Sequence, residues 1–185
     1  MPERPAGTVT PPLASDQRLL RTAFAAFATG VTVVTVGGQQ PHGMTANSFT
    51  SVSLDPPLVL VCVDRDAVMH ERLGQAGGFA VSVLSAHQDG IARHFADRTR
   101  RRGLAGFEGV AWSPGPRSGA PLIDGAIVWL ECGLWRMYEA GDHSIFIGQV
   151  RAVCRHDQEA ALLFFDGRFD RLPADRTRSP FWRVL

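Results

Sequence analysis

Short apolar runs rich in β-branched residues, separated by glycine and proline, constrain the fold of this chain most strongly. Residues 30–36, GVTVVTV, end at a glycine pair, and residues 56–63, PPLVLVCV, follow the breaker at Asp55. Residues 79–85, FAVSVLS, form another such run. Runs of this kind bounded by turn formers predict strands, and a continuous apolar run predicts a strand buried on both faces. The chain therefore predicts a mainly β architecture.

An amphipathic helix is predicted near the N-terminus. Helical spacing places four apolar side chains on one face of this segment, namely Leu20, Ala23, Phe24 and Phe27. Ser15 or Asp16 can cap its start, and Gly30 can end it. Residues 1–14 contain four prolines and little that can pack, so we predict a flexible arm there and a single domain over residues 15–185.

The remaining elements alternate between helix and strand signals. Residues 66–78 predict a short helix that ends in glycine, and Ser85 with Gln88 predicts a capping box ahead of a further surface helix. Residues 42–53 predict one strand, and residues 98–120 a long Gly/Pro/Arg loop of the kind that forms lids or interfaces. Three strands close the chain, at 126–139, 143–156 and 161–165, with a hairpin turn at 139–142. About seven strands and three helices, without a repeat or linker, indicate one barrel-like domain.

Composition excludes several classes of protein. The chain has 185 residues, 45% of them hydrophobic, 19 arginines, no lysine and a net charge of +1. It is not a strongly basic nucleic-acid binder, and it lacks the lysine of a P-loop or a Schiff base. The three cysteines form no CxxC pair and the six histidines lack metal-site spacing, so we expect no metal and cysteines that are small buried hydrophobes. Without a signal peptide or a long apolar run, we expect a cytoplasmic protein with neither membrane nor nucleic acid as a partner.

Three polar features remain as candidate sites. Hydroxyl and amide groups crowd the segment between two predicted strands, at Thr45, Asn47, Ser48, Thr50, Ser51 and Ser53. They suit a phosphate, a ribityl chain or the edge of a planar ring, or else a solvent-exposed strand face. His143 follows a turn and can act as a donor at a cofactor, or be an ordinary turn residue. The basic run at 98–102 can meet phosphate, although the neutral remainder of the chain favours a solvated loop.

Five segments, taken in order, carry a resemblance to a known family. They are FATGVTVVT (27–35), GMTANSFTSVSLDPPLVLVCVDR (43–65), FAVSVLSAHQDGIARHFA (79–96), ECGLW with GDHSIFIGQV (131–150) and LLFFDGRFDRL (162–172). The chain resembles the short-chain flavin reductases, the reductase components of two-component flavin-dependent monooxygenases. Within that family it looks most like the actinomycete reductases that serve antibiotic-pathway oxygenases. TANSFTSVSLDPP followed by GDHSIFIGQV is the most specific part of the match.

The resemblance implies a fold and a reaction. The fold is an FMN-binding split β-barrel of Greek-key topology with a few flanking helices, which forms a homodimer with flavin sites near the subunit interface. The reaction is that of an NAD(P)H:flavin oxidoreductase (EC 1.5.1.-), with NADH preferred and hydride transferred to FAD or FMN. FAD is favoured, and the free reduced flavin goes to a separate monooxygenase in antibiotic biosynthesis. Because the nicotinamide cofactor is then a substrate bound over the flavin, no Rossmann fingerprint is needed.

The resemblance also implies roles for individual residues. Near the isoalloxazine ring it places Thr29, Gly30 and Val31. At the ring edge, ribityl chain and phosphate it places Thr45, Asn47, Ser48, Phe49 and Ser53. On the ribityl and phosphate side it places Cys62, Val63, Asp64 and Arg65, and over the phosphate end Arg93, Phe95 and Ala96. Near the nicotinamide it places His143, the candidate catalytic residue, and Phe169.

Two departures from the family pattern and two rival functions accompany this interpretation. Where the family often has serine or threonine, this chain has residues 66–69, DAVM, so a phosphate contact would fall to main-chain N–H groups or His70. Phe169 replaces a frequent tyrosine and keeps only the stacking face. The rival functions are a non-catalytic flavin-binding split-barrel protein, and a split-barrel oxidase acting on a small amine or phosphorylated vitamin.

Overall fold

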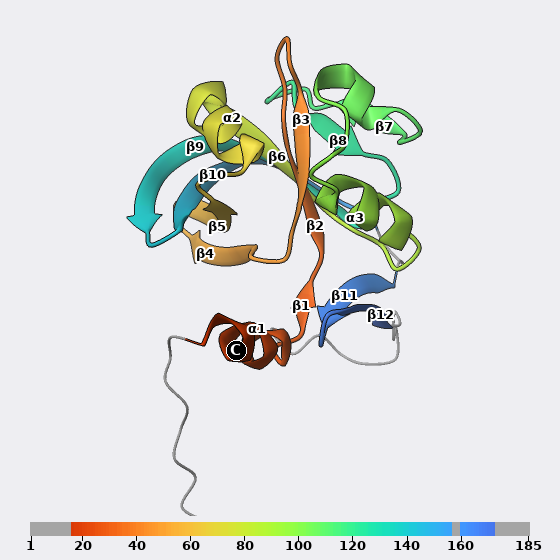
Figure 1. Ribbon diagram of the computed structural model, residues 1–185. Helices are drawn as coiled ribbons and strands as arrows, with labels where there is room; N and C mark the ends of the chain where they lie inside the picture. The colour runs from red at the N-terminus through yellow and green to blue at the C-terminus, as the bar shows by residue number, and fades with distance from the viewer. Residues whose placement is uncertain (1–15, 157–159, 173–185) are drawn as a thin grey trace, which may run out of the picture.

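A strongly curved antiparallel sheet of seven strands dominates the fold (Figure 1). The computed structural model describes residues 16–156 and 160–172, so the predicted arm at 1–14 lies outside the described residues. The strand order in this sheet is β3-β2-β6-β9-β10-β5-β4. The strands are β2 (Thr32–Val36), β3 (His42–Ala46), β4 (Thr50–Leu54), β5 (Pro57–Asp64), β6 (Gly78–Val83), β9 (Val128–Ala140) and β10 (His143–Arg155). The mainly β, split-barrel prediction is confirmed.

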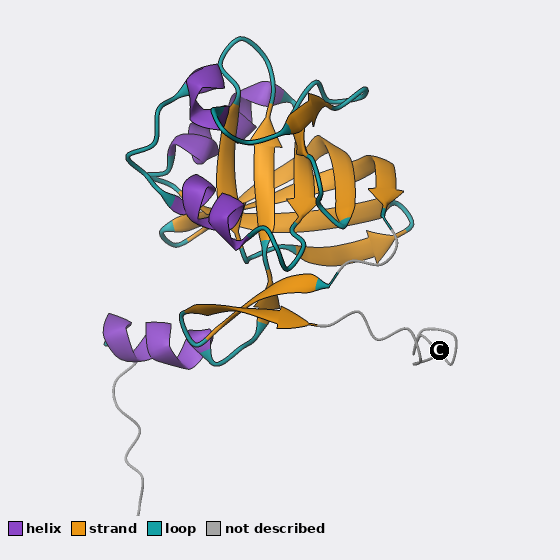
Figure 2. Cartoon of the chain, turned by 90° about the vertical axis from the view of Figure 1, so that its right-hand side faces the viewer, coloured by secondary structure: helices purple, strands orange, loops and turns teal. Residues whose placement is uncertain are grey.

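Two smaller sheets and four helical segments complete the described part of the chain. Figure 2 shows a three-stranded sheet, together with α1, set apart from the curved sheet. Its strands are β1 (Thr29–Gly30), β11 (Ala161–Phe165) and β12 (Arg168–Leu172), and the two-stranded sheet pairs β7 (Trp112–Pro114) with β8 (Pro121–Ile123). The helices are α1 (Gln17–Ala25), α2 (Val68–Ala76), α3 (Asp89–Ala96) and the short 3-10 helix η1 (Gly103–Phe107).

Residues 42–53 were predicted to be one strand, and that prediction is wrong. They form β3 and β4, which lie at opposite edges of the seven-stranded sheet. The segment between them crosses the split of the barrel and is attached to β5 by the Ser48 hydroxyl. This hydroxyl donates to the Cys62 carbonyl oxygen at 2.9 Å and accepts from the Cys62 N–H at 3.1 Å. The polar segment therefore links the two edge strands of the sheet and is anchored to β5.

The first helix also differs from its prediction. Asp16 is the N-cap, as expected, and its carboxylate accepts from the main-chain N–H groups of Arg18 and Leu19. The helix ends at Ala25, and Gly30 belongs to β1 instead of ending the helix. None of its residues is buried. The apolar face predicted from spacing is present but uncovered, with Phe24 70% exposed.

The apolar runs of the sequence supply the strands that pack in the core. All five residues of β2 are buried, including its two threonines. The continuous apolar run at 56–63 was expected to be buried on both faces, but in β5 buried and partly exposed residues alternate, so only one face packs in the core. One buried cluster lies under α2 and includes Met69 and Phe146, and a second lies under α3 and η1 and includes Phe95. A Cβ on Gly43 would lie 2.6 Å from the Phe95 ring, so glycine in β3 is what lets α3 pack closely.

Smaller predictions had mixed outcomes. Cys132 is buried and burial raises the pKa of its thiol to about 12, but Cys154 is exposed, so it is not a buried hydrophobe. Gln88 accepts from the Ser85 N–H at 3.0 Å, but Gln88 itself occupies the N-cap of α3, so only half of the capping box forms.

None of the helices described here is long and apolar enough to cross a membrane. Within residues 16–156 and 160–172, no cluster of three or more histidine, cysteine or acidic residues could hold a metal.

Candidate functional site

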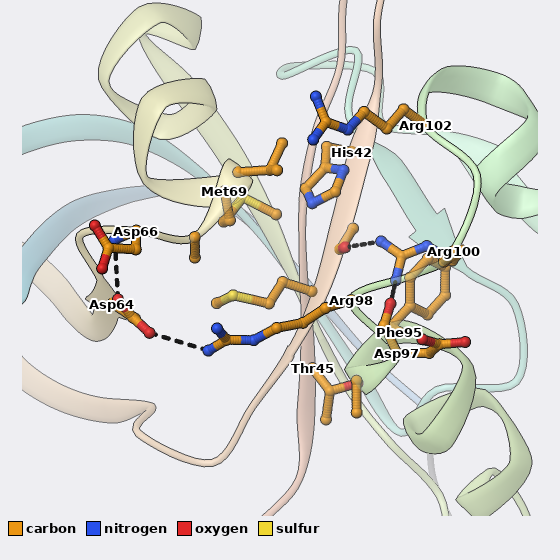
Figure 3. A pocket seen from close by; sticks show the side chains of 15 residues that line it. His42, Thr45, Asp64, Asp66, Met69, Phe95, Asp97, Arg98, Arg100 and Arg102 are labelled. Atoms are coloured by element: carbon orange, nitrogen blue, oxygen red, sulfur yellow. Dashed lines mark hydrogen bonds and ion pairs between the residues drawn. The ribbon is translucent and has the colours of Figure 1, made fainter.

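Three adjoining cavities form one groove between β3, α3 and the small β1-β11-β12 sheet. A narrow aromatic slot of about 170 Å³ is lined by Val31, Thr45, Asn47, Ala96, Phe164 and Phe169. An outer cavity adds Arg93, Asp97, Gly167 and Arg168 to Ala96 and the two phenylalanines. An inner cavity of about 390 Å³ begins at Thr45 and Ala96 and extends along β3 to α2 (Figure 3). Three arginines and three aspartates line it, and we call it the basic cavity after its arginines. Ala96, at the end of α3, lines all three cavities.

The aromatic slot has apolar walls and a polar edge. The rings of Phe164 and Phe169 meet edge to face with centroids 5.6 Å apart, and the Arg93 guanidinium lies 5.0 Å from the centroid of Phe169. Asn47 also lines the slot, and as an exposed residue it supplies an amide there. On the adjoining strand β1, the hydroxyl of Thr29 is buried and has no hydrogen-bond partner in the described chain. An apolar slot with unused polar groups nearby suits a planar ring whose edge carries hydrogen-bonding atoms.

The hydroxyl groups of Thr45 and Ser48 already have structural partners. Thr45 donates to the main-chain oxygen of Ala92 at 2.7 Å, which ties β3 to α3. Ser48 is bound to Cys62 as described above. A hydroxyl has one proton and two lone pairs, so both groups can only accept a further hydrogen bond, from a ligand O–H or N–H.

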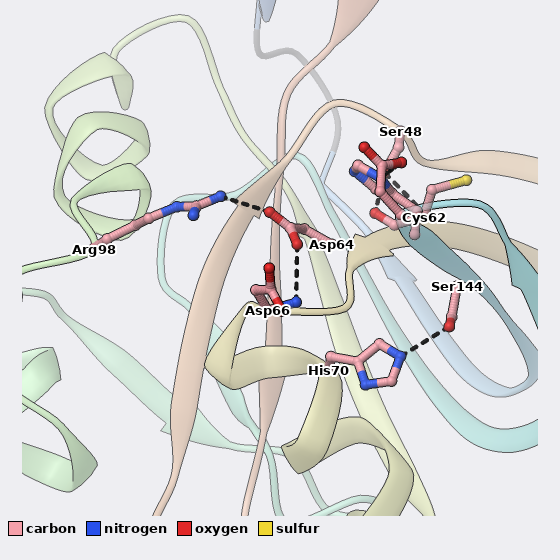
Figure 4. Close-up of polar contacts among 9 residues, drawn as sticks. Ser48, Cys62, Asp64, Asp66, His70, Arg98 and Ser144 are labelled. Carbon is pink, nitrogen blue, oxygen red and sulfur yellow. Dashed lines mark hydrogen bonds and ion pairs between the residues drawn. The ribbon is translucent and has the colours of Figure 1, made fainter.

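The turn between β5 and α2 is held by a carboxylate (Figure 4). Asp64 accepts from the Asp66 N–H at 2.9 Å and from the Arg98 guanidinium at 3.0 Å, and these bonds lower the pKa of its carboxyl group. The Ala67 N-cap of α2 makes no side-chain hydrogen bond, so the first N–H groups of the helix stay available. Ala67, Val68 and Met69 line the basic cavity. The N–H groups of Asp66 and Ala67 are already bonded to Asp64, so of the main-chain donors expected here only those of Val68 and Met69 remain candidates, and their role at a phosphate stays a prediction.

His70 and Arg65 point elsewhere. The His70 ring nitrogen Nε2 lies 2.8 Å from the Ser144 hydroxyl, and the ring packs edge to face against Phe146. Arg65 forms a 3.5 Å ion pair with Glu139 at the surface. Neither residue lines the groove, so neither places its side chain at a phosphate there.

His143 occupies the first position of β10, directly after the hairpin turn predicted at 139–142. It is paired with Asp64 on β5, and its Nδ1 lies 2.8 Å from the Asp142 carboxylate. That contact lowers the pKa of the Asp142 carboxyl group. The imidazole is half-exposed and does not line the groove within one chain, although its strand neighbour Asp64 does. Its role at a nicotinamide therefore stays a prediction.

The basic run at 98–102 is exposed, as expected of a solvated loop, except at Arg100, which is partly buried. Arg98 pairs with Asp64, and Arg101 pairs with Glu108 at 3.0 Å on the surface. Arg100 turns inward, stacks 4.9 Å from the centroid of Phe95 and donates to the Gly43 oxygen on β3. Together with Arg102 this run forms one wall of the basic cavity.

The structure gathers part of the predicted set and disperses the rest. Predicted residues that line the groove are Val31, Thr45, Asn47, Asp64, Arg93, Phe95, Ala96 and Phe169. Val63 is 1% exposed in the core and Phe49 packs against that core, so their side chains face away from a ligand. Thr29, Gly30, Ser48, Ser53, Cys62, Arg65 and His143 do not line it.

Several lining residues were missed from the sequence, and Phe164 and His42 are two of them. Phe164 could have been found from alternation, because it shares a face of β11 with the buried Leu162. His42 lines the basic cavity from β3, and only the pairing of β3 with β2 places it there.

Comparison with known proteins agrees with this geometry. Residues 24–173 match the family described as "Flavin reductase like domain". The chain belongs to the flavin reductase-like family. It is 56% identical over 171 residues to an NADH-dependent FAD reductase of Streptomyces globisporus, covering 92% of each chain.

Two solved structures match the fold of this family member closely. The flavin reductase component of a bacterial two-component tryptophan halogenase matches with a TM-score of 0.84 and 56% identity, over 86% of this chain and 100% of that one. The NADH:FAD oxidoreductase of Streptomyces globisporus C-1027, solved with NAD and FAD fragments, matches with a TM-score of 0.82 and 55% identity. That match covers 87% of this chain and 95% of the other.

Proposed function

We propose that the chain is an NADH-dependent flavin reductase that transfers hydride to FAD or FMN. The observation that carries this proposal is the aromatic slot, which joins residues from four segments of the family match in one ligand-sized groove. The relative named an NADH-dependent FAD reductase supports NADH and FAD as the substrate pair. An oxidoreductase acting on NADH and flavin is of class EC 1.5.1.-, and the proposal extends to that class.

The residues of the slot fit a flavin ring. Phe164 and Phe169 offer apolar faces, Asn47 offers an amide, and the unpartnered Thr29 hydroxyl lies on the adjoining strand. The flavin supplies the redox chemistry, and the chain binds and orients it while excluding water from the apolar walls. Donors at the ring edge also stabilise the negative charge that appears on reduction. His143 is proposed to act toward the nicotinamide, with its ring oriented by Asp142.

Anaerobic reduction tests the proposal. The purified protein is loaded with FAD, excess flavin is removed, and NADH is added while the absorbance of oxidised flavin is followed. Bleaching of the oxidised-flavin absorbance after NADH is added is expected, together with steady-state NADH oxidation when FAD, FMN or riboflavin is supplied. Bound flavin that stays oxidised would identify a non-catalytic flavin-binding protein instead. Absence of both binding and turnover with every flavin would refute a flavin function.

The destination of the reduced flavin is the second part of the proposal. One structural relative is the reductase component of a two-component halogenase, and another comes from Streptomyces globisporus C-1027. We propose release of free reduced flavin to a separate monooxygenase in an antibiotic pathway. A dialysis membrane between the reductase and a flavin-dependent oxygenase tests this, because freely diffusing flavin sustains product formation across the membrane and channelled flavin does not.

We propose a homodimer from exposed apolar side chains on α1 and just beyond its end. On α1, Leu19 is 41% and Phe24 is 70% exposed, and Phe27, two residues after the last residue of the helix, is 77% exposed. α1 stands beneath the small sheet that carries Phe164 and Phe169 (Figure 1). Large apolar side chains exposed close together typically mark an interaction surface. Light scattering after size-exclusion chromatography should give twice the chain mass, and Phe24→Ser with Phe27→Ser should give a monomer; a monomeric wild type contradicts the proposal.

A further inference from the structure

A separate cavity of about 230 Å³ lies at the C-terminal end of α2 and shares no lining residue with the groove. Ala67 and Val68, at the start of α2, line the basic cavity, whereas Ala76 and Gly77, at its end, line this one. The helix has nine residues, so about 13 Å of helix separates the two cavities. We call the second one the α2-end cavity. A ligand bound in it would not touch a flavin in the groove.

Glycines open the floor of the α2-end cavity. Gly78 on β6 pairs directly with Gly133 on β9, so neither strand places a side chain there. Gly77 ends α2 in the left-handed conformation, with φ at 64°. Further along the same face of the sheet, Leu122 of β8 packs against Ala80 of β6. The cavity is therefore a gap beside this covered part of the sheet, where the strands lack the side chains that would fill it.

A β-bulge directs Arg151 across this floor. The register of β10 against β9 shifts between Val150 and Ala152, so Arg151 lies outside the regular ladder. A Cβ on Gly133 would lie 2.6 Å from the guanidinium carbon of Arg151, so the guanidinium lies directly over that glycine. Among the described residues, Arg151 has no ion-pair partner and its side chain makes no hydrogen bond. Its N–H donors are therefore available to a ligand.

Glu131 contributes a buried carboxylate with one unused oxygen. The residue is 4% exposed, and its Oε2 accepts from the N–H groups of Arg117 at 2.8 Å and Ser118 at 2.7 Å and from the Ser118 hydroxyl at 2.8 Å. Oε1 accepts no hydrogen bond from the described chain, yet it is not sealed in the protein, so it is open to the cavity. Glu131 lies two residues before Gly133, which places its Cα about 7 Å along β9 from the glycine under Arg151.

The charges in the cavity call for a ligand that carries both signs. Arg151 and Glu131 line the same space without forming an ion pair with each other. Arg117 is a further exposed lining residue, and Cys132 adds no charge, because burial and the charge of Glu131 raise the pKa of its thiol to about 12. A simple anion would meet the arginines but leave Oε1 of Glu131 without a donor. A simple cation would satisfy Oε1 but leave Arg151 without an acceptor.

We propose that the α2-end cavity is a second ligand site of this protein and binds a free α-amino acid as its zwitterion. The carboxylate of the amino acid pairs with Arg151, and its ammonium group donates to Oε1 of Glu131. The volume of about 230 Å³ holds a small molecule of this class. The inference does not rest on the proposed flavin reductase function, because no residue of the groove takes part.

Isothermal titration calorimetry of the flavin-free protein at pH 7 tests the site, with the twenty common L-α-amino acids as separate probes. At least one should bind with one-to-one stoichiometry and a dissociation constant of about 1 mM or lower. Acetate and methylammonium each carry one half of the zwitterion, so each should bind at least about tenfold more weakly. Saturation with FAD should leave the dissociation constant of the amino acid unchanged.

Two variants remove one charge each. Arg151→Gln and Glu131→Gln should each raise the dissociation constant of the amino acid about tenfold or more, as for loss of one charge-assisted bond. Arg151→Gln should melt like wild type, because this exposed side chain bonds to nothing in the described chain. Glu131→Gln keeps a carbonyl oxygen for the turn at 115–118 and places an amide NH₂ group at the position of Oε1. Arg155→Gln is the matched control, because Arg155 is exposed on the same strand and does not line the cavity.

The other outcomes overturn the assignment. If no amino acid binds at concentrations up to about 10 mM, the cavity is not a site for this class of ligand. Acetate or methylammonium binding as tightly as the amino acid would make it a simple anion or cation site. Binding that Arg151→Gln leaves unchanged, or that FAD abolishes, would place the amino acid elsewhere on the protein.

Discussion

Replacing Ser48 with alanine separates a structural role from a flavin contact. The Ser48 hydroxyl makes two hydrogen bonds to the main chain of Cys62, at 2.9 and 3.1 Å, and holds the segment that crosses the split of the barrel. The substitution leaves a donor and an acceptor on β5 without partners at a partly buried position. Each unsatisfied group costs roughly 1–3 kcal/mol, and water reaches this site in part, so the total loss should be about 2 kcal/mol. For a chain of this size that lowers the Tm by roughly 4–8 °C.

The assay is thermal and urea unfolding of the flavin-free protein, followed by flavin titration. Ser51→Ala is the control, since Ser51 is exposed on β4 and its side chain makes no hydrogen bond within the described residues. The Ser48 variant should be destabilised before any flavin is added, and its weaker flavin binding should follow from the loosened Asn47. Unchanged stability without flavin, combined with lost flavin affinity, would refute this reasoning and make Ser48 a direct ligand contact.

Three further predictions concern packing, pH and the nicotinamide side. Gly148→Ala would place a Cβ 2.5 Å from the Phe79 ring and 2.9 Å from the Cys132 Cβ, so the free energy of unfolding should fall by about 1–3 kcal/mol. Gly90→Ala is the control, because a Cβ there meets nothing within 4 Å and should not lower stability. The midpoints of urea unfolding measure both effects. The pKa of His42 is about 4 in the folded chain, against an ordinary value of 6.5 for an unfolded chain. Between these two pH values the unfolded chain binds one more proton than the folded chain, so stability falls as the pH drops from 6.5 to 4. His42→Gln should flatten that part of the pH–stability curve, and an equally steep curve would exclude His42 as its source. His143→Ala should raise the KM for NADH with flavin affinity unchanged. His87→Ala is the control, because His87 is exposed and does not line the groove, and equal kinetics of the two variants would remove His143 from the reaction.

The strands could be predicted because their signals are local. Each continuous apolar run became a central strand, and the hairpin at 139–142 followed from two long runs on either side of a glycine turn. The division of residues 42–53 could not be predicted, because it depends on which edge of the barrel each half reaches. β12 was missed for a related reason: residues 168–172 are mostly polar and form a strand only by pairing with β11.

The candidate site was also predictable only in part, because its residues come together through contacts between distant segments. Asn47, Ala96 and Phe169 lie far apart in the chain, and only the family resemblance joined them in advance. The inward turn of Arg100 was missed because its partners are main-chain oxygens on β3 and α3, which no sequence pattern reports. The occupied hydroxyl groups of Thr45 and Ser48 were hidden for the same reason.

Blocking the groove tests the central claim most directly. Ala96 is an exposed residue that lines all three cavities, so Ala96→Trp fills the groove without disturbing the core. Ala76→Trp, the same change at the exposed end of α2 and outside the groove, is the control. The dissociation constant for FAD measured by titration should rise at least tenfold for Ala96→Trp and stay at the wild-type value for Ala76→Trp. A folded Ala96→Trp variant that binds FAD as tightly as wild type would contradict the placement of the flavin in this groove.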